Sequence, residues 1–339
     1  MRTSFQICIL SLVALIIGVA APRVNAQCPA DLNGDGQINQ ADVAQLLANS
    51  GPVPFPPPVI PPIVPAWATL LEAAPNPAVV TDANLRAAIV ASGLAWRVRD
   101  NGTNIEMLLV PAGTFTMGCS ASTQYECYST ESPTHQVTLT QAFYMGRYEV
   151  TQAQWTAKMG SNPSFFVPAN GYSSDTTKPV EQVSWDMIAS TGGFMSVTGL
   201  RLPSEAEWEF AYRAGTTTAF HSYPAQPNGF NDDSLLGNIA WYDQNSGGQT
   251  HAVGGKLANG LGLHDMAGNV YEWCQDWYGE TYYASSPLTN PTGLATGSFR
   301  SSRGGSWGSH SRNHRGSTRN ASQPSNIASY WGFRAVRTP

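Results

Sequence analysis

Lysine is nearly absent from this chain: Lys158, Lys178 and Lys256 stand against 15 arginines. Charged residues make up only 12% of the 339, which is low for a soluble protein, and the net charge of −5 does not by itself indicate a partner. Glycine (32), proline (24) and tryptophan (10) are plentiful. This composition argues against a helical bundle and indicates a loop-rich globular body held together by aromatic packing.

Cysteine is also scarce, and none follows Cys274. Once a leader segment is removed, four remain: Cys28, Cys119, Cys127 and Cys274. An even number permits disulfides in an oxidising compartment. Cys119 and Cys127 are close enough in sequence to close one loop, whereas the pairing of the other two is left open.

Long hydrophobic runs are absent except at the start. Arg2 precedes an apolar run from Ile7 to Ala21, and Val24-Asn25-Ala26 resembles a cleavage site. Residues 1–26 are therefore predicted to be a secretory signal peptide, because the run is short for a membrane anchor. We expect a secreted, cell-surface or periplasmic protein without a lipid anchor, a membrane span or a nucleic-acid partner.

The segment from 27 to 50 contains a pattern typical of an EF-hand calcium loop, followed by a short helix. Its six predicted ligands are Asp31, Asn33, Asp35, Gln37 through its carbonyl, Asn39 and Asp42. The loop resembles one half of a dockerin, the module that binds cohesin. Because dockerins carry two such loops, a small calcium-stabilised cap or spacer is an equal alternative to a cohesin partner.

The proline-rich stretch 51–66 is predicted to be an extended linker. A short helical lead-in is expected over 67–104, with one helix around Thr69–Ala73 and a second over Asp82–Ala91, capped by Thr81 or Asp82.

The main body is expected from 105 to 339. Strands are predicted on both sides of Pro111-Ala112-Gly113, as a hairpin, and again at His135–Leu139 and Ala142–Tyr148. Thr151, Ser184 and Ser204 are predicted to cap helices. Ser204 with Glu207 forms a capping box. Glu205, Glu207 and Glu209 could be catalytic in principle, but pairing with arginine or the helix start is favoured.

Acidic and amide side chains gather in Leu261–Trp277, between large apolar residues. Asp265, Asn269, Glu272 and Asp276 supply four oxygen side chains, which suits a bend that is buried on one side and holds a hard cation on the other. The alternative is an acidic turn on an aromatic core. In the loop 220–257, Asn238 and Asp243 could likewise serve a second cation or act as ordinary turn residues.

The last forty residues carry seven arginines and no acidic residue. The arginines could line a cleft for an anionic or peptide partner, or pair internally with Glu205, Glu209, Glu272 and Asp276. Internal pairing is predicted for Arg300, Arg303 and Arg334, and exposure for Arg312, Arg315 and Arg319.

Seven motifs occur in order and together resemble the formylglycine-generating enzyme, or sulfatase-modifying factor, domain. They are V-P-A-G-T-F-T-M-G (110–118), E-V-T-Q-A-Q-W (149–155), P-V-E-Q-V-S-W (179–185), R-L-P-S-E-A-E-W-E-F-A-Y-R-A-G (201–215), G-L-H-D-M-A-G-N-V-Y-E-W (262–273), R-G-G-S-W (303–307) and W-G-F-R (331–334). The resemblance implies an α+β, C-type-lectin-like fold with little regular secondary structure.

The resemblance also implies calcium. By matching positions, Asp265, Glu272 and the carbonyls of Gly268 and Val270 would form one site, and Asn238 and Ile239 would form part of another.

The family's oxidase converts a sulfatase cysteine to formylglycine with O₂ and Cu(I), which two cysteines hold. Here the two thiol positions carry Ser309 and His314, and neither replaces a thiolate well. We therefore expect calcium rather than copper as the cofactor. One hypothesis is a non-catalytic binding or accessory protein whose surface at 308–320 recognises a protein, peptide or glycan. The other is a formylglycine-generating or different metal-dependent oxidase with altered ligands, in which Ser309, His310 and His314 take part.

Overall fold

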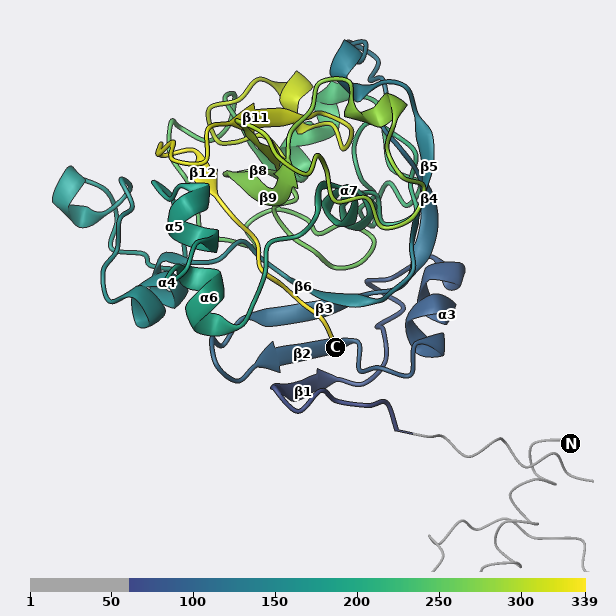
Figure 1. The fold of residues 1–339 in the computed structure, drawn as a ribbon, viewed down its shortest axis with the longest axis horizontal. Helices are drawn as coiled ribbons and strands as arrows, with labels where there is room; N and C mark the ends of the chain where they lie inside the picture. Colours follow the sequence, from purple (N-terminus) through teal and green to yellow (C-terminus); the bar gives the residue numbers. More distant parts are fainter. Residues whose placement is uncertain (1–60) are drawn as a thin grey trace, which may run out of the picture. The chain divides into compact units, whose positions relative to one another are not determined.

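The computed structural model describes residues 61–339 (Figure 1). The predicted signal peptide, Cys28, the calcium loop with Asp31, Asn33, Asp35, Gln37, Asn39 and Asp42, and most of the proline-rich linker lie outside the described residues. Residues 61–339 form one compact unit by themselves. Among them, no helix is both long enough and apolar enough to cross a bilayer.

Short strands and short helices alternate along this unit, with long connections between them. The strands are β1 (Ala68–Glu72), β2 (Arg97–Asp100), β3 (Glu106–Val110), β4 (Gly113–Met117), β5 (His135–Leu139), β6 (Phe143–Gly146), β7 (Ala240–Trp241), β8 (Ala267–Gly268), β9 (Tyr271–Trp277), β10 (Arg300–Arg303), β11 (Asn320–Ser322), β12 (Trp331–Gly332) and β13 (Val336–Arg337). The helices are α3 (Ala83–Ala91), α4 (Gln152–Met159), α5 (Trp185–Ala189), α6 (Phe194–Thr198) and α7 (Glu205–Arg213). Five 3-10 turns are η1 (Ser129–Glu131), η2 (Pro168–Asn170), η3 (Asp233–Asn238), η4 (Tyr282–Ala284) and η5 (Ser311–His314).

The largest sheet has the order β1-β2-β3-β6-β13, and its neighbouring strands are antiparallel. Strand β3 lies at its centre, and four of its five residues are buried. The helix predicted around Thr69–Ala73 is wrong: this segment is the edge strand β1, because pairing with β2 outweighs its weak helical pattern.

The hairpin predicted around Pro111-Ala112-Gly113 is also wrong, although both strands exist. Strand β3 pairs with β2 and β6, whereas β4 pairs with β5 in a separate two-stranded sheet. The turn therefore passes the chain from one sheet to the next, and the partners of both strands come from elsewhere in the sequence.

A second sheet has the order β11-β10-β9-β12 and carries the buried aromatic residues Tyr271, Trp273 and Trp331. Trp273 on β9 is fully buried and stacks on Trp331 of β12 with ring centroids 4.5 Å apart. Four consecutive residues from Tyr271 to Cys274 are buried. The four oxygen-bearing side chains of this stretch, Asp265, Asn269, Glu272 and Asp276, are all buried. Helix α7 packs against β4, β9 and β10, so it lies between the sheets (Figure 1).

The predicted helix caps are confirmed. Asp82, Thr151, Ser184 and Ser204 each accept a backbone N–H near the start of α3, α4, α5 and α7. The Ser204–Glu207 capping box is present. Sequence signals that act over three or four residues thus gave the helix starts correctly.

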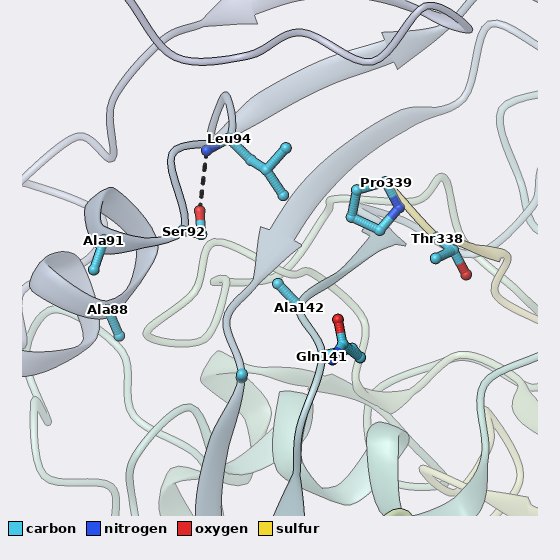
Figure 2. Close-up of a pocket in the computed structure, with 9 residues that line it drawn as sticks. Ala88, Ala91, Ser92, Leu94, Gln141, Ala142, Thr338 and Pro339 are labelled. Atoms are coloured by element: carbon cyan, nitrogen blue, oxygen red, sulfur yellow. Dashed lines mark hydrogen bonds between the residues drawn. The ribbon is translucent and has the colours of Figure 1, made fainter. Parts of the chain in front are cut away.

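A cavity of about 590 Å³ lies between α3, the end of β13 and the segment before β6 (Figure 2). Its lining consists of Ala88, Ala91, Ser92, Leu94, Ala112, Gln141, Ala142, Thr338 and Pro339. The Ser92 hydroxyl accepts the amide of Leu94 at its rim. None of these nine side chains is titratable.

Candidate functional site

Ser309 lies in the loop that follows β10, in a short chain of hydroxyl groups. Its Oγ is 2.9 Å from Ser306 Oγ, accepts the Ser306 amide at 3.2 Å and donates to the Tyr271 hydroxyl at 3.2 Å. Gly304 and Gly305, with φ of 95° and 78°, make the tight turn that sets this loop against β9. The hydroxyl is thus held by neutral partners, and no base contacts it within residues 61–339.

His314 ends η5 and is fully buried. Its Nδ1 lies 3.1 Å from the His310 carbonyl and its Nε2 lies 3.3 Å from the Ser306 carbonyl. Burial lowers the pKa of His314 to about 4, so the ring is neutral at ordinary pH. The ring also packs so closely on Gly305 that a Cβ at Gly305 would lie 2.6 Å from it. Both nitrogens therefore face the loop's own backbone.

His310 and His314 do not share a face. His310 is exposed, caps η5 through its side chain and faces the Tyr125 hydroxyl at 3.4 Å, whereas His314 is buried. A two-histidine metal site in this loop has no support from the described geometry.

The predicted Cys119–Cys127 disulfide is confirmed. Cys274 is a free thiol in the core, where burial raises its pKa well above the ordinary value. Residues 61–339 thus contain no pair of free thiols. Cu(I) requires soft sulfur ligands, and the hydroxyl of Ser309 with the enclosed ring of His314 does not fit it.

The arginines of the last forty residues enter a buried ion-pair network more deeply than predicted. Arg303 pairs with Glu205 at 3.0 Å and with Glu209 at 2.6 Å, and Arg334 pairs with Glu272 at 2.7 Å, as expected. The exposure predicted for Arg315 and Arg319 is wrong. Arg315 pairs with Glu131 and Arg319 with Glu205, and both arginines are buried.

Two other arginines behave differently from each other. Arg300 was expected to pair with a carboxylate. It instead lies against the rings of Trp185 (3.6 Å) and Trp277 (3.4 Å) and donates to the Gln275 carbonyl. Arg312 is half-buried, stacks on Tyr128 at 3.8 Å and has no ion pair within the described part of the chain.

Glu205 is a structural ion-pair partner, not a free acid. Burial opposes its ionisation, but Arg319 and Arg303 outweigh this and lower the pKa of Glu205 to about 2. Asp276 accepts the Glu205 amide at 2.8 Å. Burial and then the Glu205 charge raise the pKa of Asp276 to about 8.

The predicted first calcium set lies beside a carboxylate that the sequence did not single out. Glu149 is buried and accepts the side chain of Asn269 at 2.7 Å and the amide of Val270 at 3.0 Å. Burial, followed by the charge of Asp265, raises the pKa of Glu149 well above its ordinary value. The sequence gives no signal of this contact, because Glu149 lies about 120 residues before Asn269 and Val270.

Asp265 and Glu272, the two carboxylates of this set, have different hydrogen-bond partners. Asp265 accepts the Gly254 amide at 2.6 Å, and burial raises its pKa to about 6. Both oxygens of Glu272 accept from Arg334, and one also accepts from Trp208. Gly268 is packed on Trp241, where a Cβ would lie 2.3 Å from a backbone oxygen.

The predicted second set lies around η3. Asn238 is exposed and donates to the Leu235 carbonyl and the Tyr223 hydroxyl, while Ile239 is buried. Asp243 is exposed. Lys256 Nζ donates to the Gly237 carbonyl at 2.6 Å, so a positive charge already lies next to Asn238.

Comparison with known proteins places this geometry in context. Residues 95–339 match the family model described as the sulfatase-modifying factor enzyme 1-like domain. The chain is 29% identical over 316 residues to a formylglycine-generating enzyme of Streptomyces coelicolor, with 78% of this chain and 95% of that protein covered. It is 32% identical over 256 residues to the serine/threonine-protein kinase pkn1 of Chlamydia caviae. That match covers 68% of this chain and only 38% of the kinase.

Two solved structures are similar in fold. PvdO from Pseudomonas aeruginosa aligns with a TM-score of 0.59 and 26% identity, covering 72% of this chain and 98% of PvdO. Treponema denticola variable protein 1 aligns with a TM-score of 0.57 and 31% identity, covering 69% of this chain and 95% of that protein. The family-model match and these neighbours agree with a mixed α/β fold that has few helices.

Proposed function

The chain belongs to the sulfatase-modifying factor enzyme 1-like domain family, and from this we propose that it is a secreted, non-catalytic binding or accessory protein built on that domain. The observation that carries the proposal is the chemistry at the family's two thiol positions. Ser309 is held in a chain of neutral hydroxyls, and His314 is buried with both nitrogens facing backbone carbonyls.

The buried ion pairs support a scaffold role for the surrounding residues. Of the three candidate acids, Glu205 and Glu209 each contact at least one buried arginine, and Glu207 pairs with the partly exposed Arg201. A carboxylate held this way accepts hydrogen bonds from the guanidinium and is poorly placed to take a proton from a substrate. The loop 308–320 then remains as the recognition surface, with His310, Arg312, Asn313 and Asn320 at least partly accessible.

The activity test uses the purified chain and a sulfatase peptide containing C-x-P-x-R, incubated with copper and O₂. We expect no conversion of the cysteine to formylglycine by mass spectrometry, because residues 61–339 contain no pair of free thiols to hold Cu(I). Metal analysis of the same material is expected to show calcium and neither copper nor iron. Aldehyde on the peptide, or stoichiometric copper or iron, would support an oxidase with altered ligands.

A matched variant tests whether the missing thiols are the reason. Ser309→Cys combined with His314→Cys restores sulfur at both positions and is expected to gain Cu(I) binding that the parent chain lacks. Ser309→Ala with His314→Ala serves as the control, since it also empties the His314 space but adds no sulfur. Equal Cu(I) binding by the parent chain and both double variants would show that the residues at 309 and 314 do not determine Cu(I) binding.

A further inference from the structure

A cavity of about 350 Å³ lies next to the Ser309 loop, within the range of about 300–1,000 Å³ that is usual for ligand sites. Its lining is Tyr128, Ser129, Thr130, Tyr271, Asn313, Thr318, Arg319 and Asn320. Three separate stretches of the chain supply these residues: the segment around η1, strand β9 and the segment 313–320. Tyr271 connects the cavity to Ser309, which donates to its hydroxyl at 3.2 Å.

Every lining side chain carries a hydroxyl, an amide or a guanidinium, and none is aliphatic. The Asn313 carbonyl oxygen accepts from the Tyr128 hydroxyl, and the Asn320 oxygen accepts the Ala321 amide. Within residues 61–339, no protein group accepts from the side-chain NH₂ of either asparagine. These amides, with the hydroxyls of Ser129 and Thr130, can hydrogen-bond a ligand at several points.

The cavity offers no unpaired charge, although an arginine lines it. Arg319 donates through Nε and Nη2 to Glu205, and through Nη1 to the carbonyls of Thr130 and Gly279. Its charge is therefore balanced by Glu205 inside the protein. Among the lining residues an acidic ligand would meet no free cation. Arg312, which has no ion pair within residues 61–339, lies against the Tyr128 ring but does not line the cavity.

Aromatic rings supply the remaining contact surface. Tyr128 is held in place by Arg312, which stacks on its ring at 3.8 Å. Tyr271 lies edge-on to Tyr330 at 6.5 Å, and Tyr330 is 42% exposed, so the aromatic surface continues outward from the cavity. Rings with a polar tip, set among amides and hydroxyls, contact the C–H faces of a small ligand while its polar groups remain hydrogen-bonded.

We propose that this cavity binds a neutral, hydroxyl-rich ligand of the carbohydrate class, as one sugar unit of a glycan. A charged peptide side chain would meet no free charge in the lining, and an aliphatic one would meet no aliphatic wall. A sugar ring presents hydroxyls around its edge and C–H groups on its face, which matches the amides, hydroxyls and tyrosine rings. This inference rests on the proposed binding function and names its ligand class.

The experiment is ligand-observed saturation-transfer NMR with the full chain and four probes: glucose, galactose, mannose and N-acetylglucosamine. We expect saturable binding of at least one of them. Asn313→Ala combined with Asn320→Ala should weaken that binding about tenfold, because each lost hydrogen bond contributes roughly 0.5–1.5 kcal/mol. The control is Asn228→Ala, which alters a polar cavity elsewhere in the fold and should leave binding unchanged.

Circular dichroism melting checks that each variant is folded. If the double variant does not fold, Asn320→Ala alone should weaken binding severalfold. No saturable sugar binding, saturable binding of added glucuronate alone, or sugar binding that the asparagine variants leave unchanged would each overturn the proposal. Sugar binding can fail while the peptide still shows no aldehyde, so the failure of this inference is distinguishable from the failure of the proposed function.

Discussion

Individual buried carboxylates in this protein have very different surroundings. Glu205 faces Arg303 and Arg319, which hold its pKa near 2, whereas Asp276 has only the Glu205 amide and lies close to the Glu205 charge. At neutral pH, Glu205 is therefore ionised and Asp276 is protonated, although the Asp276 carboxyl accepts the Glu205 amide. The two pKa values differ because the arginines pair with Glu205 and not with Asp276.

Asp276→Asn is predicted to reduce the fall in stability as the pH rises. An aspartate ionises near pH 4 when unfolded, but Asp276 does so only near pH 8 in the fold. Stability is therefore lost as the pH rises from about 4 to about 8. Asparagine cannot ionise, and it can still accept the Glu205 amide.

The measurement is the free energy of unfolding in urea at pH 5 and at pH 8 for both proteins. The variant should lose less stability than the parent over this interval. Histidines with lowered pKa values, such as His221 and His264, affect both proteins equally. Identical changes in the two proteins would contradict the protonated state assigned to Asp276.

Among the secondary-structure elements, helix α7 has a capping box that stabilises its N-terminal end. Ser204 accepts the Glu207 amide at 3.1 Å, and Glu207 accepts the Ser204 amide at 2.8 Å. Helices of this length are marginal by themselves and need caps and packing to form. The first turn of α7 also presents Glu205 to the arginines of the neighbouring segments, so its start must be fixed.

Ser204→Ala is predicted to lower the free energy of unfolding by about 1 kcal/mol, because an alanine leaves the Glu207 amide without its cap. Urea denaturation at pH 7 measures it. Ser190→Ala, at the exposed C-terminal end of α5, is the control and should change stability by less than about 0.5 kcal/mol. Similar losses in both variants would mean that the cap has no special role.

At the scale of the whole molecule, ion pairs join segments that are distant in sequence. Glu205 contacts Ser301, Arg303 and Arg319, which are 96 or more residues away from it. Arg315 reaches Glu131 across 184 residues. In a fold with short strands and long loops, these contacts fix the loops to the sheets and shape the cavity near Ser309.

Glu205→Gln is predicted to destabilise the protein by about 3–5 kcal/mol, because it leaves two buried guanidinium groups short of a counter-charge. Arg201→Gln is the matched control. It removes the pair with Glu207, in which Arg201 is 39% exposed, and should cost less than about 1 kcal/mol. Urea unfolding of both variants at pH 7 decides the question; a loss for Glu205→Gln no larger than for Arg201→Gln would refute the prediction.

Local chemistry determined what could be predicted from the sequence. The helix caps at Asp82, Thr151, Ser184 and Ser204 act within three or four residues, and the Cys119–Cys127 loop closes within eight. The ordered motifs identified the family, and their missing cysteines raised the question of activity. These features need no knowledge of distant contacts.

Only the tertiary structure decided which residues pair across the fold. It assigned β3 and β4 to different sheets, turned the segment at 68–72 into an edge strand and buried Arg315 and Arg319 against acids far away in the chain. The physical reason is that strand pairing and ion pairing depend on which groups meet in space, and residues more than a hundred positions apart leave no periodic signal of that meeting.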